Sequence, residues 1–352
     1  MPSSPLDDAR AFLAGWVRPR ADAIDRSLPA LREALAELGR RGYLGLRIPR
    51  DVGGLEFAPM DFRRFQEASA RASGALAFVE SQHQSACGLL ARSPNAALRA
   101  RALPRLARAD ESSAIAFSHL RRSGPPALVA APAPGGYRLD GRLPWVTGWG
   151  LFTHCATAAV LPDGRVLFAY HPLGASAALS PSAPLDLAAM AVTQTVEVEV
   201  KGLFVPEDDV IDLHPANWIQ ANDRIAVALQ SPLALGCAGA AVDVLREEAG
   251  RKSRPAMLAA AEGLERELES VREEAYRAME ENADFARSLR ARSAVIELAG
   301  RAAHAAVVAA AGAGNVMGHP AQRVYREALA FSVLALLPPI QDAALERLSR
   351  PR

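Results

Sequence analysis

The chain has 352 residues, half of them hydrophobic, and its 40 Lys and Arg nearly balance its 39 Asp and Glu. A formal net charge of +1 gives no electrostatic field that would gather a polyanion, so we expect no nucleic-acid partner. The length predicts two or three domains with a large apolar core.

Cysteine usage and the apolar runs indicate a cytoplasmic protein. Cys87, Cys155 and Cys237 lie far apart and match neither a metal-ligand spacing nor a disulfide framework, so we expect no metal site and a reducing compartment. The N-terminal MPSSPLDDARAF lacks the basic and apolar runs of a signal peptide. The uncharged run from Ala328 to Ile340 is shorter than the ~20 residues that span a bilayer, so we expect no membrane partner.

Residues 1–112 are expected to form an N-terminal α-helical domain. Leucines recur at three- and four-residue spacing from Leu28 to Leu38, Ser27 is placed to cap that helix, and Pro29 lies in its first turn. In the LRIPRDVGG stretch that follows, Pro49 and the Gly53-Gly54 pair predict a turn instead of a continued helix.

Residues 113–213 are expected to form an antiparallel β domain, either a barrel or a sandwich. Alternating apolar and polar residues replace the helical spacing, most clearly in TVEVEVKGLFVP, where valines and charged residues occupy opposite faces. The Asp140-Gly141 and Asp163-Gly164 pairs each predict a hairpin turn.

Residues 214–352 are expected to form a C-terminal four-helix bundle, with breaks near Gly250 to Pro255 and Gly312 to Pro320. The whole chain is therefore an α+β multidomain protein. Its GAGNVMG stretch superficially suggests a dinucleotide-binding loop, but it follows an alanine-rich helix and not a strand, which excludes a Rossmann fold.

Four stretches together resemble the acyl-CoA dehydrogenase family, and the resemblance spans nearly the whole chain. They are LRIPRDVGGLEF, GYRLDGRLPWVTGWG, MAVTQTVEVEVKGLFVPEDDVI and AAGAGNVMGHPAQRVYREA. The resemblance implies that family's fold, an oxidoreductase with a flavin cofactor, FAD, and an acyl-CoA or other acyl thioester as substrate. It also implies a homodimer or homotetramer, because the family builds flavin sites across subunits. The sequence does not identify the electron acceptor or the acyl chain.

Two segments are candidates for contact with the flavin ring. In the strand through Trp145, Val146 and Thr147, an indole can shield the ring while a hydroxyl bonds its polar edge. From the residues alone, Trp145 also fits the core and Thr147 a strand surface. Phe117 and Ser118 stand where the family has its second flavin contact, with a hydroxyl retained. His119 and His83 fit either a proton carrier or a structural histidine.

The glycine turn is the candidate for contact with the FAD diphosphate. The resemblance implies that backbone amides at Gly312 and Gly314 approach the pyrophosphate. A left-handed stop between two helices explains the same glycines. The family's Arg-x-x-Phe-Gly grip on FAD is replaced here by LREEAGRKSRPAM, so FMN or a transiently bound reduced flavin is an alternative to FAD.

The usual catalytic base of the family is missing. An ungapped comparison places Ala335 where most members carry the Glu that removes the α proton, and an alanine methyl group accepts no proton. Asp223, directly before Arg224, stands where isovaleryl-type members carry their Glu and is the candidate base. The alternative is an exposed acid that favours the start of a helix.

Three functions fit these observations. The first is flavin-dependent α,β-dehydrogenation of an acyl thioester. The second is a two-component flavin monooxygenase of the same fold, which uses reduced flavin and needs no base for an α proton. The third is a catalytically degenerate paralogue that acts as a subunit of a complex.

Overall fold

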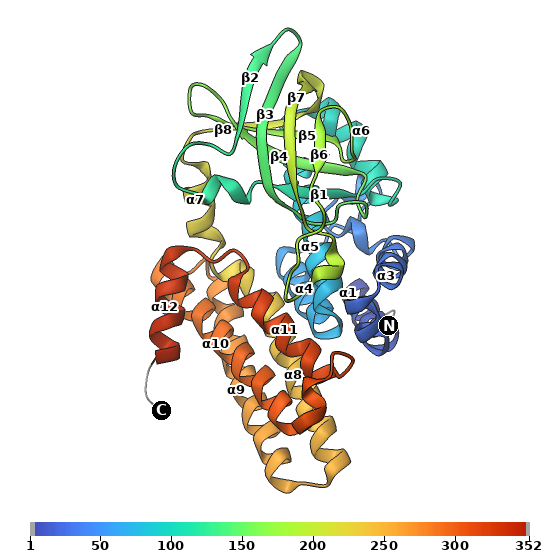
Figure 1. Cartoon of the computed structure of the whole chain (residues 1–352), viewed down its shortest axis with the longest axis vertical. Coiled ribbons are helices and arrows are strands. Elements are labelled where there is room, and N and C mark those ends of the chain that lie inside the picture. The colour runs from blue at the N-terminus through green and yellow to red at the C-terminus, as the bar shows by residue number, and fades with distance from the viewer. Residues whose placement is uncertain (1–3, 350–352) are drawn as a thin grey trace.

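The computed structural model describes residues 4–349. The molecule is elongated, with a β-sheet domain at one end, a helical bundle at the other, and the N-terminal helices packed beside the junction (Figure 1). This arrangement is the predicted sequence of α-helical, β and α-helical regions. The last N-terminal helix ends at Ala107, the strands run from Ser113 to His214, and the next helix begins at Trp218.

The helices of the N-terminal region follow the leucine pattern and its caps. Their bounds are α1 (Pro5–Phe12), α2 (Ala21–Arg26), α3 (Leu28–Arg40), α4 (Pro59–Ala72), α5 (Gly74–Ala91) and α6 (Ala96–Ala107). Ser27 caps α3 as predicted, because its hydroxyl accepts a hydrogen bond from the Ala30 amide at 3.4 Å. The turn predicted in LRIPRDVGG is also confirmed, with Gly53 at a φ of 92°.

The middle domain is one sheet in the order β6-β7-β3-β2-β4-β5-β8, with β1 paired to β4. The strands are β1 (Ser113–Ala116), β2 (Leu128–Ala133), β3 (Gly136–Val146), β4 (His154–Val160), β5 (Val166–Pro172), β6 (Leu179–Pro181), β7 (Val196–Pro206) and β8 (Val210–His214). The prediction of a purely antiparallel domain is wrong, because β1 and β2 both run parallel to β4. Each reaches β4 through a connection longer than a hairpin turn, which permits parallel pairing.

One of the two predicted hairpins is confirmed and the other is wrong. Asp163-Gly164 forms the turn between β4 and β5, where Val160 pairs with Val166. Asp140-Gly141 lies inside β3, and the turn before that strand is at Gly135 instead. Gly141 has a φ of 133° at an irregularity in the pairing with β7, and a Cβ there would lie 2.3 Å from the Ala127 carbonyl oxygen. The glycine therefore serves a bulge and not a turn.

The C-terminal helices pack around α8. Their bounds are α7 (Trp218–Ala226), α8 (Ser231–Lys252), α9 (Pro255–Glu280), α10 (Phe285–Ala310), α11 (Pro320–Val333) and α12 (Pro338–Ser349). Helix α8 contacts α9, α10 and α11 in the bundle and α4 of the N-terminal region. The predicted breaks before Pro255 and Pro320 are confirmed, and a third break between α9 and α10 was not predicted.

Two helical stretches are long and apolar enough to cross a bilayer by length and composition alone. They are Ala228–Lys252 and Phe285–Asn315, and the most apolar windows are 89% and 56% buried inside the protein. A core helix of a globular protein passes the same test, so this is weak evidence for a membrane span.

Buried ion pairs fasten α11 to the N-terminal region. The Glu327 carboxylate accepts hydrogen bonds from the Gly74 amide at 2.9 Å and from Arg323 at 3.0 Å. Burial raises the pKa of Glu327, and Arg323 acts in the opposite direction. Arg323 also donates to Asp22 at 2.7 Å, so Arg323 and Glu327 together join α2, α11 and the start of α5. This joint fixes the segment after α11 relative to the rest of the molecule.

Candidate functional site

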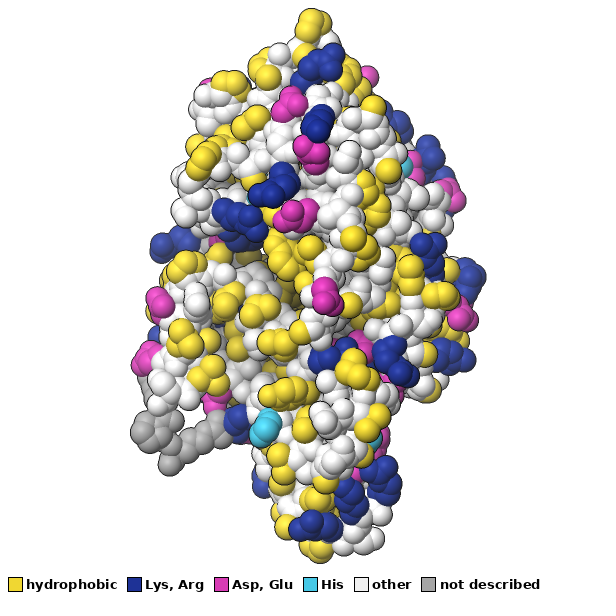
Figure 2. All heavy atoms as spheres, viewed as in Figure 1, with side chains coloured by type: hydrophobic (Ala, Val, Ile, Leu, Met, Phe, Trp, Pro, Cys, Tyr) yellow, Lys and Arg dark blue, Asp and Glu magenta, His cyan; other side chains and the backbone are white. Residues whose placement is uncertain are grey.

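Three neighbouring elements at the junction between sheet and bundle carry Trp145, Ser118 and Asp223. The 3-10 turn η5 (Ser118–Arg121) contacts β3 on one side and α7 on the other. Apolar surface gathers near this junction, and the molecule is recessed there (Figure 2). The fold therefore brings the segments of Trp145, Ser118 and Asp223 into one neighbourhood, although they lie far apart in the sequence.

Trp145 is exposed, so its interpretation as a core residue is wrong. The indole is 45% exposed near the end of β3, whereas Val146 next to it is fully buried in the core. An exposed indole costs solvation free energy unless another surface covers it, which suits a flat apolar ligand. Thr147 is buried and is not a strand surface residue, since its hydroxyl lies 3.0 Å from the Thr195 hydroxyl.

The residues at the start of η5 differ in burial. Phe117 packs against Phe168 and Trp218, with ring centroids 5.7 Å and 6.1 Å away. Ser118 is exposed, so its hydroxyl is available to a ligand. His119 is buried, and its Nε2 lies 3.0 Å from the Ala158 carbonyl oxygen. Burial lowers the pKa of His119 to about 4, so the ring is neutral at physiological pH.

His83 is a structural histidine on α5. Its Nδ1 accepts a hydrogen bond from the Ser113 amide at 3.1 Å, and its Nε2 donates to the Leu44 carbonyl oxygen at 3.0 Å. Burial lowers the pKa of His83 to about 4. Both ring nitrogens are therefore occupied by the backbone, which explains this residue without a proton-carrier function.

Asp223 is buried and forms an ion pair across the junction. Its carboxylate accepts two hydrogen bonds from Arg121 of η5, at 2.8 Å and 2.7 Å. The Asp223 residue is 8% exposed, so its interpretation as an exposed acid at a helix start is wrong. A bidentate guanidinium holds the carboxylate in a fixed orientation. Arg224 points elsewhere, because its guanidinium stacks on Phe285 of α10 with the carbon 5.0 Å from the ring centroid.

The apolar segment around Ala335 is a turn between α11 and α12. Ala335 has a φ of 50°, which breaks the helix. The next two residues, Leu336 and Leu337, pack in the same small core as Val227, which directly follows α7. The segment predicted to carry the family's usual base therefore lies next to the end of α7. The side chain there is a methyl group.

A buried arginine holds this turn in place. Arg292 of α10 is 1% exposed and donates to the carbonyl oxygens of Phe331 and Leu334, each at 3.3 Å, and of Gln230 at 2.6 Å. Burial lowers the pKa of Arg292 to about 10, which leaves it charged. The cation satisfies carbonyls at the end of α11, where the helix dipole favours positive charge.

The glycine turn has an unexpected geometry. It forms the 3-10 turn η9 (Ala311–Asn315), and Ala311 has a φ of 57°, while neither Gly312 nor Gly314 has a positive φ. The interpretation of these glycines as a left-handed stop is therefore wrong, because an alanine breaks the helix. A Cβ on Gly312 would meet nothing within 4 Å, so its backbone is open to a ligand, whereas Gly314 is buried.

These observations fit the ring of a flavin better than its diphosphate. An exposed indole at Trp145 and an exposed hydroxyl at Ser118 on a contacting element supply an apolar wall and a polar edge contact. Of the two glycines predicted to contact the FAD diphosphate, only Gly312 has a backbone open to a ligand. Among residues 4–349, no group of three or more His, Cys, Asp and Glu side chains could hold a metal ion.

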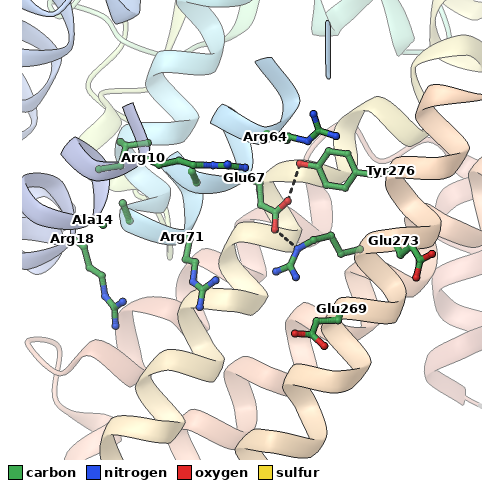
Figure 3. A pocket seen from close by; sticks show the side chains of 13 residues that line it. Arg10, Ala14, Arg18, Arg64, Glu67, Arg71, Glu269, Glu273 and Tyr276 are labelled. Carbon is green, nitrogen blue, oxygen red and sulfur yellow. Dashed lines mark hydrogen bonds and ion pairs between the residues drawn. The ribbon is translucent and has the colours of Figure 1, made fainter. Parts of the chain in front are cut away.

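A separate cavity of about 760 Å³ lies between the first helices, α4 and α9. Figure 3 shows Arg18 and Arg71 pointing the same way and Glu67 directed at Tyr276. Several of its charges are paired, since Glu67 accepts from Tyr276 at 2.8 Å and from Arg272 at 2.6 Å, and Arg71 pairs with Asp243. This cavity contains none of the predicted site residues.

Comparisons with known proteins agree with this architecture. A model of the acyl-CoA dehydrogenase N-terminal domain matches residues 5–110. The mitochondrial isovaleryl-CoA dehydrogenase of Pongo abelii is 28% identical over 211 residues, which is 57% of this chain and 50% of the relative. The enzyme of the same name from Arabidopsis thaliana is 25% identical over 211 residues, 57% of this chain and 51% of the relative. The chain thus spans about half the length of these curated relatives.

Solved structures extend the match to the whole fold. A glutaryl-coenzyme A dehydrogenase in complex with glutaryl-CoA has a TM-score of 0.83 at 18% identity, covering 98% of this chain and 94% of its own. Butyryl-CoA dehydrogenase from Megasphaera elsdenii has a TM-score of 0.81 at 17% identity, covering 99% of both chains.

Residues 5–110 match the acyl-CoA dehydrogenase N-terminal domain, and the whole chain has the fold of the acyl-CoA dehydrogenases. The family is one of flavoprotein oxidoreductases whose members bind FAD, and the resemblance found in the sequence is confirmed. The assignments of individual residues to flavin or substrate stay predictions. Two features of the site were not predicted from the sequence, the Arg121 partner of Asp223 and the Arg292 support of the turn at Ala335.

Proposed function

We propose that this protein is a flavin-dependent oxidoreductase that dehydrogenates an acyl thioester between its α and β carbons. The observation that carries the proposal is the buried carboxylate of Asp223, on the helix that contacts η5, while η5 also contacts the strand of the exposed Trp145. The similarity to acyl-CoA dehydrogenases supports the substrate class, and the burial and fixed orientation of the Asp223 carboxylate support it as the base.

Each group has a separate part in the proposed reaction. Bound FAD supplies the acceptor for the hydride that leaves the β carbon. Asp223 accepts the proton from the α carbon. Arg121 is a positioning residue, because its two hydrogen bonds fix the carboxylate and it does not itself touch the reacting atoms. Trp145 covers one face of the flavin and excludes water from it.

The test compares two aspartates in closely matched settings. Asp223→Asn should abolish dye-coupled oxidation of acyl-CoA by the protein reconstituted with FAD. Asp243→Asn is the control, because Asp243 is also 8% exposed and pairs with both nitrogens of Arg71, at 2.9 Å and 2.7 Å, in the bundle. Equal turnover in the two variants would remove Asp223 from the mechanism.

A two-component monooxygenase is the second candidate function, and one observation favours it. Asp223 is already engaged by Arg121, and Ala335 offers no base, so the site suits a reaction that takes up reduced flavin and abstracts no α proton. Oxygen consumption with a flavin reductase, NADH and FMN or FAD, independent of any acyl-CoA, would support this function over dehydrogenation.

Self-association and location complete the proposal. An apolar groove of about 1040 Å³ runs over α9, α10 and α12, and its lining includes Val308, Leu345 and Leu348, each more than half exposed. We expect a homodimer or homotetramer to cover this surface, which light scattering after size exclusion would show.

All three cysteines are free and buried, which supports a reducing, cytoplasmic location.

A further inference from the structure

The cavity between the first helices, α4 and α9 exists because its walls carry small side chains. Helix α4 contributes Ala68 and Ala72, one turn apart, and the π-helical turn η1 (Leu13–Val17) contributes Ala14. Helix α4 is also held tightly on α8, since a Cβ on Gly236 of α8 would lie 2.2 Å from a carbonyl oxygen of α4. The alanines therefore leave a space of about 760 Å³ open, which is the size of a small-molecule pocket.

Two arginines on the wall of this cavity have donors without an acceptor. Arg10 of α1 has no hydrogen-bond acceptor within residues 4–349, and its ion pair with Asp7 is 3.6 Å long. Arg272 of α9 donates to Glu67 through Nε at 2.6 Å, and its two terminal nitrogens have no acceptor among the same residues. Figure 3 shows Arg10 extending toward Glu67, the carboxylate that Arg272 binds. The two guanidiniums therefore offer free N–H groups to an anion in the cavity.

The acids of the cavity limit the charge of that anion. Glu67 is occupied by Arg272 and by the Tyr276 hydroxyl, which donates at 2.8 Å. Burial raises the pKa of Tyr276, and the Glu67 charge acts in the same direction, so the phenol keeps its proton. Glu269 of α9 also lines the cavity and forms no ion pair within the described part of the chain. Five arginines and three glutamates line the cavity, a modest positive excess that suits a carboxylate better than a doubly charged phosphate.

We propose that this cavity binds a medium-chain fatty acid, with the carboxylate on Arg10 and Arg272. The alkyl chain lies over Leu13, Ala68 and Ala72, which form the apolar part of the wall. A guanidinium and a carboxylate make charge-assisted hydrogen bonds, and each buried methylene adds apolar contact. The cavity shares no residue with the predicted flavin and substrate site, so this binding goes beyond the proposed reaction and does not depend on it.

The test is calorimetry on the full-length protein with three probes. Octanoate carries both the charge and the chain, 1-octanol carries the chain alone, and acetate carries the charge alone. Octanoate should bind at one site per chain, at least about tenfold more tightly than either of the other two. Saturating octanoyl-CoA should leave the octanoate affinity unchanged, because the cavity lies outside the predicted reaction site.

Two variants locate the site, each with a matched control. Arg10→Met removes the free guanidinium and should weaken octanoate binding about fivefold. Its control is Arg20→Met, because Arg20 is exposed and donates to the Trp16 carbonyl oxygen outside the cavity.

Ala68→Leu fills the space that the alkyl chain occupies and should weaken octanoate binding about tenfold or more. Its control is Ala11→Leu, at an exposed position of α1 that does not line the cavity. Both controls should bind octanoate as the wild type does. Melting temperatures within the range of the controls show that the two site variants are folded.

Each outcome supports or overturns the fatty-acid site. Octanoate binding no tighter than that of 1-octanol, or equal to the wild type in both Arg10→Met and Ala68→Leu, overturns it. Displacement of octanoate by octanoyl-CoA places the ligand in the reaction site and also overturns it. Selective binding that both variants weaken supports it, whether or not any acyl-CoA reduces the flavin.

Discussion

Arg121 and Asp223 form a bidentate ion pair, with hydrogen bonds of 2.8 Å and 2.7 Å, that joins the turn after β1 to the first helix of the C-terminal region. The Asp223 side chain is 11% exposed and that of Arg121 23% exposed. The pair therefore lies in a partly dry environment, where geometry is better defined than on an open surface.

Removing the arginine tests its positioning function. Arg121→Met leaves a buried carboxylate without the guanidinium that orients it, so the rate of flavin reduction by acyl-CoA should fall about tenfold or more while acyl-CoA binding is retained. We expect a loss of stability of roughly 2 kcal/mol. The exposed neighbour Arg122→Met should change neither the rate of flavin reduction nor the stability. An unchanged rate of flavin reduction in Arg121→Met, with stability lowered, would show that the pair is only structural.

Trp145 should matter for the flavin and little for folding. Trp145→Ala removes an indole that is 45% exposed, so we expect stability to change by about 0.5 kcal/mol or less and flavin affinity to fall at least tenfold. Phe204→Ala on β7, which is 41% exposed, provides the matched control. Fluorescence titration with FAD measures both variants. Equal affinity in the two would place the flavin elsewhere.

Acid should destabilise the protein through His83. Burial lowers the pKa of this histidine to about 4 in the folded state, below its ordinary value of 6.5. The unfolded chain therefore binds an extra proton between these values, and stability is lost as pH falls from about 6.5 to 4. His83→Gln should flatten that part of the curve of melting temperature against pH. His304→Gln, at an exposed position on α10, should not.

Glu80 should have the opposite kind of effect at higher pH. Its pKa is raised by burial to about 8 from an ordinary 4.5, so the folded state binds the extra proton and stability falls as pH rises through this range. The wild type should lose about 1.4 kcal/mol of stability for each pH unit in this range. Glu80→Gln cannot ionise, so its stability should not depend on pH there. Melting temperatures of the two proteins should be close at pH 5 and separate in favour of the variant by pH 8.5. Parallel curves would contradict this account.

Periodic local patterns predicted the elements, while long-range pairing was not predictable. The leucines of α3 and the valines of β7 follow their periods closely enough to fix both elements. The parallel pairing of β1 with β4 depends on strands about 40 residues apart, and no local signal encodes it. Asp140-Gly141 misled because a bulge and a turn both require glycine at a positive φ.

The site was predictable only in part for the same reason. The family resemblance located Trp145 and Asp223, and the fold places their elements next to η5. The partner of Asp223 lies 102 residues away in the chain, so the ion pair depends on tertiary packing.

The most direct measurement is an anaerobic titration of the FAD-reconstituted protein with acyl-CoA, followed by flavin absorbance. Our account predicts that the absorbance near 450 nm bleaches in the wild type and in Asp243→Asn and stays unchanged in Asp223→Asn. Bleaching in Asp223→Asn equal to that of the wild type, or none in the wild type, would contradict it.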